Sequence, residues 1–112
     1  MSEEIDLAEA LLELKDILRD HMVEFLKKNG IKEMYTDDIR NIVDTLLKWF
    51  DGEIDDLEFV NRVQNILLYY TSTKSPSKIA TRLLEHLKNV IRKACEELGI
   101  PTGEETISRL LG

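Results

Sequence analysis

The two histidines, His21 and His86, are the residues whose type best suits metal binding or acid–base chemistry. A carboxylate-bridged metal centre in a helical bundle needs Glu-x-x-His motifs on facing helices. Leu18 stands three residues before His21, and Leu83 three residues before His86, so neither motif is present. The sequence therefore predicts that each histidine lies on a helix flank or at the surface, and we expect no metal and no other cofactor.

Acidic residues recur at three- and four-residue steps near the N-terminus, at Glu9, Glu13, Asp16, Asp20 and Glu24. Such a row would suit magnesium, as in an all-α nucleotide pyrophosphatase, if a second acidic pair faced it. No matching pair is visible, and a charged row opposite an apolar seam is typical of a solvated face. Cys95 falls on an apolar stripe and is predicted to be a buried thiol. Without a phosphate loop, zinc spacing or nucleophile motif, we expect no enzymatic activity.

Six cations lie between residues 74 and 93, with Glu85 as the only acid. Helical spacing places four of them opposite the apolar seam of their segment. They form either a solvated face that balances an acidic half or a docking face for an anionic surface, such as membrane head groups or RNA. Trp49, at the edge of another apolar stripe, is either a core residue or a further contact. The predicted partner-binding residues are Lys74, Lys78, Arg82, Arg92, Lys93 and Trp49.

The formal net charge of −7 disfavours nucleic acid as a partner. Residues 1–58 carry 17 acidic and seven basic side chains, whereas residues 59–112 carry five acidic and eight basic ones. Helix packing within one bundle is the simplest use of such complementary halves, so 1–112 is predicted to be a single domain. The longest apolar run, residues 66–70, is far shorter than the ~18 residues of a membrane span, and the start is acidic. We therefore expect a cytoplasmic protein without a transmembrane segment.

Apolar periodicity and boundary residues predict helices near residues 3–28, 37–50, 56–71, 76–98 and 103–111. The expected N-caps are Ser2, Thr36, Asp55, Ser75 and Thr102, each suited to accept backbone N–H hydrogen bonds. The first helix is predicted to be the longest. Its surplus length would either overhang the bundle or pack against a second copy of the protein.

The third predicted helix contains the most continuous apolar surface, DLEFVNRVQNILLYY. A face of Leu57, Val60, Val63, Leu67 and Tyr70 is widened by Phe59, Ile66 and Tyr69, which predicts a helix in the middle of the bundle. Short connectors between amphipathic helices favour antiparallel neighbours. The predicted fold class is therefore all-α, an antiparallel four-helix bundle with a short fifth C-terminal helix.

Several short motifs follow one another along the chain, namely Tyr35-Thr36-Asp37, Val60-Asn61-Arg62-Val63, Asn65, Tyr69-Tyr70, Thr71-Ser72-Thr73-Lys74 and Val90-Ile91-Arg92-Lys93-Ala94. Their order resembles the immunity proteins of class IIa bacteriocins, the enterocin A immunity family. The resemblance covers residues 35–99, with Cys95 standing where the family has glycine. It implies a cytosolic four-helix bundle that recognises the mannose phosphotransferase membrane receptor while a bacteriocin is bound to it, through its C-terminal half.

Two functions follow as predictions. The first is a non-enzymatic helical binding protein, with bacteriocin immunity as its most concrete form and a membrane receptor complex as its protein partner. The alternative is a small accessory or regulatory subunit, of viral or mobile-element type, that acts through protein–protein contacts and forms a homodimer through the first helix.

Overall fold

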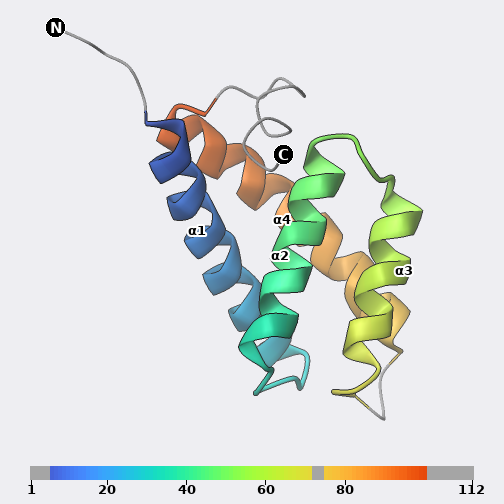
Figure 1. Cartoon of the computed structure of the whole chain (residues 1–112). Coiled ribbons are helices and arrows are strands. Elements are labelled where there is room, and N and C mark those ends of the chain that lie inside the picture. The colour runs from blue at the N-terminus through green and yellow to red at the C-terminus, as the bar shows by residue number, and fades with distance from the viewer. Residues whose placement is uncertain (1–5, 72–74, 101–112) are drawn as a thin grey trace, which may run out of the picture.

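The computed structural model describes residues 6–71 and 75–100, and all regular structure in this part is helical. The helices are α1 (Leu7–Lys28), α2 (Thr36–Phe50), α3 (Asp56–Leu67) and α4 (Pro76–Leu98). Each helix packs against the next one along the chain, and α4 also packs against α1, which closes the bundle. Consecutive helices run in opposite directions, and α4 crosses diagonally from the end of α3 to the start of α1 (Figure 1). The predicted fifth helix, 103–111, lies outside the described residues.

Local capping explains where α1 and α2 begin. The backbone N–H of Glu9 donates a 3.2 Å hydrogen bond to Oδ1 of Asp6, so Asp6 is the N-cap of α1 and the predicted start near residue 3 was wrong. Thr36 was also wrongly predicted as a cap, because it is the first residue of α2 and Tyr35 precedes it without a side-chain cap. With 22 residues, α1 is one residue shorter than α4, so it is not the longest helix.

The boundaries of α3 and α4 follow the sequence more closely. Asp55 caps α3 by accepting a 2.8 Å hydrogen bond from the backbone N–H of Glu58. Ser75 caps α4 ahead of Pro76, the first residue of that helix. Gly99 ends α4 with a φ of 72°, a left-handed conformation that glycine adopts without a Cβ clash. However, α3 ends at Leu67 and not near residue 71.

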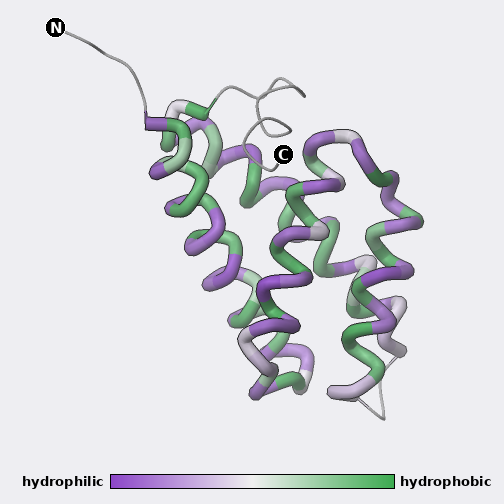
Figure 2. The backbone as a smooth tube through the Cα atoms, in the orientation of Figure 1, coloured by the Kyte–Doolittle hydropathy of each residue, from purple (hydrophilic) through white to green (hydrophobic). Residues whose placement is uncertain are grey.

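The core is organised around α4. Eight of its residues are buried, namely Ile79, Ala80, Leu83, Leu84, Leu87, Ile91, Ala94 and Cys95. They meet an α1 seam that contains Leu14, Leu18 and Met22, all with no exposed surface. Figure 2 shows hydrophobic and hydrophilic residues alternating within the turns of each helix, as expected when one face of each helix is covered. The thiol of Cys95 is buried as predicted, and burial raises its pKa.

The position predicted for the third helix was wrong. Only Phe59, Val63 and Leu67 of α3 are buried, whereas Leu57 is 68% exposed. The face that carries Phe59, Val63 and Leu67 is the covered one, toward the helices α2 and α4 that α3 packs against. A wide exposed face therefore replaces the narrow exposed edge that the sequence had suggested for α3, and the largest set of buried residues belongs to α4.

Candidate partner-binding surface

The predicted cations of α4 are available to a partner. Lys78, Arg82, Arg92 and Lys93 are all exposed, and none of them forms an ion pair with another residue in the ranges 6–71 and 75–100. An exposed cation without a carboxylate partner can bind an anionic group without first breaking an ion pair. Lys74, the other predicted cation, lies outside the described residues.

These cations form two groups along α4. Lys78 and Arg82 are one turn apart at the start of the helix, and Arg92 lies a further ~15 Å along the axis at 1.5 Å per residue. Arg92 and Lys93 are followed four residues later by the exposed acids Glu96 and Glu97. Opposite charges at this spacing share a helix face and reduce the local positive potential. At the start of α4 the same effect comes from one acid, Glu85, three residues after Arg82, so this part of the predicted face is the more cationic one.

Trp49 is held by contacts inside the protein. Its Nε1–H donates a 2.5 Å hydrogen bond to Oδ1 of Asp56, and the ammonium group of Lys88 lies 5.5 Å from its ring centroid. Lys88 also donates a 3.1 Å hydrogen bond to Oδ2 of Asp56. This cluster joins α2, α3 and α4, so the half-buried indole has a structural role that the sequence did not reveal.

Asp56 makes the stability of this cluster depend on pH. The hydrogen bonds from Trp49 and Lys88 favour the carboxylate and lower the pKa of Asp56 below its ordinary value of 3.8. Because the folded-state pKa is depressed, the stabilisation is complete above pH 3.8 and is lost as the pH falls through the folded-state value. Asp56→Asn should therefore destabilise the protein modestly at pH 7 and have less effect near pH 3, measured by urea unfolding. An equal loss at both pH values would contradict this assignment.

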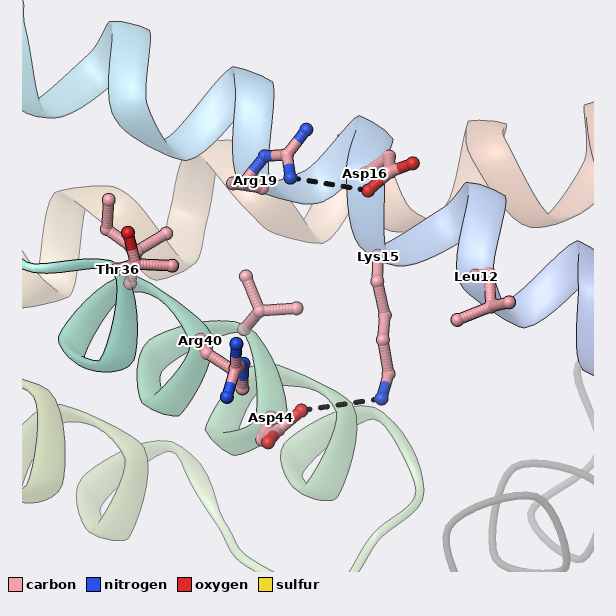
Figure 3. A pocket seen from close by; sticks show the side chains of 9 residues that line it. Leu12, Lys15, Asp16, Arg19, Thr36, Arg40 and Asp44 are labelled. Carbon is pink, nitrogen blue, oxygen red and sulfur yellow. Dashed lines mark ion pairs between the residues drawn. The ribbon is translucent and has the colours of Figure 1, made fainter.

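A groove of about 440 Å³ between α1 and α2 is among the largest concavities in the described part of the chain. Figure 3 shows Lys15 of α1 reaching toward Asp44 of α2, at 3.7 Å, and Arg19 beside Asp16 at 3.4 Å. Arg40, the third cation of the groove, lies 3.7 Å from Asp37. Every cation of the groove thus has a carboxylate nearby, so the groove offers no free charge for an anionic ligand.

The histidines lie together, which sequence reasoning missed. The rings of His21 on α1 and His86 on α4 are 6.1 Å apart between centroids, and Phe25 stacks on His86 at 5.4 Å. Both histidines are exposed, as predicted. No group of three or more His, Cys, Asp or Glu residues that could hold a metal occurs within residues 6–71 and 75–100. The pair therefore fits a surface contact between α1 and α4.

All three tyrosines gather at one end of the bundle, in the α1–α2 connector and just after α3. Tyr35 is 78% exposed and Tyr69 is 86% exposed, although the sequence had placed Tyr69 on a covered face. Leu68, which is 59% exposed, lies in the sequence between the end of α3 and Tyr69. We call the three tyrosines, Tyr35, Tyr69 and Tyr70, the tyrosine end. Exposed aromatic residues next to an exposed leucine are typical of protein-binding surfaces.

Tyr70 fixes the backbone of the tyrosine end. Its hydroxyl donates a hydrogen bond to Oδ2 of Asp38 at the start of α2, which raises the pKa of Tyr70. The same oxygen accepts a 3.2 Å hydrogen bond from the backbone N–H of Tyr35. One side chain thereby ties the end of α3 to the α1–α2 connector, and the exposed rings of Tyr35 and Tyr69 are carried on an ordered scaffold.

No family model, curated protein or solved structure matches this chain. The resemblance to bacteriocin immunity proteins therefore remains a prediction from the sequence. None of the helices within the described residues is both long enough and apolar enough to cross a bilayer.

Proposed function

We propose that this protein is a non-enzymatic docking protein, and that its binding surface is the tyrosine end together with Lys78 and Arg82. The observation that carries the proposal is the exposure of Tyr35 and Tyr69 at the end of the bundle where α4 begins. Lys78 lies in the first turn of α4 and Arg82 in the second, so both belong to the same end. Tyrosine and arginine are enriched among the residues that dominate binding energy.

The charge distribution supports this end over the opposite one. The loop between α2 and α3 and the start of α3 carry Asp51, Glu53, Asp55 and Asp56 within six residues. An anionic partner would be repelled there, whereas the start of α4 presents cations without carboxylate partners. Glu33 and Asp37 flank Tyr35, so within the tyrosine end it is the side next to Lys78 and Arg82 that favours an acidic surface.

The most concrete version of this function is immunity to a class IIa bacteriocin, which rests on the resemblance over residues 35–99. In that version the docking protein recognises the membrane receptor while the bacteriocin is bound to it. The Tyr69-Tyr70 motif that carries part of the resemblance also supplies part of the tyrosine end. The sequence similarity and the exposed surface therefore favour the same region of the molecule.

A protection assay tests the immunity version. A bacteriocin-sensitive strain that expresses the wild-type chain is expected to survive a class IIa bacteriocin, whereas the double variant Tyr35→Ser/Tyr69→Ser should lose protection. Both rings are largely exposed, so their removal should leave the fold intact. Leu12→Ser, which removes a 64% exposed leucine on α1, is the matched control and should still protect.

The outcomes test separately whether the tyrosine end is the binding surface and whether the protein confers bacteriocin immunity. Equal protection by the wild type and the tyrosine variant would remove the tyrosine end from the mechanism. If the wild type protects against none of a panel of class IIa bacteriocins, the immunity version fails. The accessory-subunit function would then be the preferred proposal. Its partner would be sought by affinity capture with immobilised wild-type protein, with the tyrosine variant as the control.

A further inference from the structure

We propose that the outward face of α3 is a self-association surface, on which a second copy of this chain packs antiparallel to the first. The face is a stripe of four exposed or half-buried residues, Leu57, Asn61, Gln64 and Leu68, which we call the α3 stripe. Leu57 and Leu68 are 68% and 59% exposed, among the most exposed leucines of the described chain. Their separation of eleven residues is three helical turns, so they lie on one line.

The α3 stripe is uncharged on a protein of net charge −7. The charged groups of α3 that border the stripe are each paired, Glu58 with Arg62 at 2.7 Å and Asp56 with Lys88 of α4 at 3.1 Å. Two copies of an acidic chain repel each other across most surfaces. Repulsion between two copies is smallest at a face without net charge. The charge distribution therefore favours the α3 stripe as the surface that contacts a second copy of the chain.

The order of residues along the stripe is self-complementary. In a two-fold interface, if residue i of one copy contacts residue j of the other, then residue j of the first copy also contacts residue i of the second. For antiparallel α3 helices with the axis at the midpoint between Arg62 and Val63, this rule pairs Leu57 with Leu68. The same axis pairs Asn61 with Gln64, whose side chains already form a 3.3 Å hydrogen bond within one copy. Apolar groups would therefore cover apolar groups, and amides would face amides, with no unpaired charge enclosed.

The outer face of α1, the dimer surface suggested by the sequence, fits less well. Its large exposed apolar residue is Leu12, while Glu9 and Glu13 also face solvent and form no ion pair within the described residues. A second copy packed there would bring like charges together. A single helix face covers less than the ~800 Å² per partner of a standard interface, so the α3 dimer should be weak and concentration-dependent.

Sedimentation velocity over a range of concentrations tests the interface and its orientation. The mass of the wild type should rise from 13.0 kDa toward twice that value as concentration increases. Leu57→Lys and Leu68→Glu should each remain monomeric, because symmetry places every substitution in two contacts and weakens the dimer by roughly a hundredfold or more. An equimolar mixture of the two variants should recover dimer, since the introduced lysine of one copy then faces the introduced glutamate of the other.

The mixture is decisive because a parallel arrangement would not bring the introduced lysine and glutamate together. Leu12→Lys, at an exposed site on α1, is the control and should dimerise like the wild type. A wild type that stays monomeric up to millimolar concentration overturns the proposal, as does loss of dimer in Leu12→Lys or a mixture that remains monomeric. Both α3 substitutions are at exposed sites, and circular dichroism of each variant checks that the helices are retained.

Discussion

Leu87→Asp is expected to abolish folding, and Leu87→Ala to lower the free energy of unfolding by about 2–5 kcal/mol. Leu87 has no exposed surface and lies halfway along the buried stripe of α4, the helix that contacts both α1 and α3. An aspartate there would be an unpaired charge in an apolar core, whereas alanine would leave a cavity.

Urea and thermal unfolding followed by circular dichroism measure both effects. The matched control is Asn89→Ala, two residues further along the same helix on its exposed face, which should change stability by no more than ~0.5 kcal/mol. A Leu87→Ala protein that melts within a degree or two of the wild type would show that the register of α4 is wrong.

The sequence predicted α4 well because several local signals agree there. Ser75 and Pro76 mark the start, Gly99 marks the end, and the apolar residues between them form one line. By contrast, the first turn of α3 has apolar residues on two sides, Leu57 and Phe59. Periodicity cannot decide which of the two is covered, because that depends on where α2 and α4 pack.

The candidate surface was predictable only in part. The exposure of Lys78, Arg82, Arg92 and Lys93 follows from their place opposite the apolar seam of one helix. The tyrosine end depends on two segments about 35 residues apart, joined by the contact between Tyr35 and Tyr70. The interactions of Trp49 likewise involve residues on two other helices. Such contacts are properties of the packed bundle and have no local sequence signal.

Recognition and folding should be separable by charge reversal on α4. The variant Lys78→Glu/Arg82→Glu/Arg92→Glu/Lys93→Glu is expected to keep its helix content and nearly its full melting temperature. None of these side chains forms an ion pair within the described residues, and exposed charges contribute little to stability. Binding to bacteriocin-treated membranes of a sensitive strain should be lost, because a like-charged face repels an acidic partner and slows encounter.

Splitting the variant in two locates the effect. Lys78→Glu/Arg82→Glu should account for most of the lost binding, since these cations lie beside the tyrosine end, while Arg92→Glu/Lys93→Glu serves as the matched control near Glu96 and Glu97. Wild-type binding should also weaken as salt rises, because screening acts on exposed charges. Full binding by the four-glutamate variant would remove the cations from recognition. An unfolded variant would instead show that these cations hold the acidic helices together, so that their role is to balance charge within the bundle.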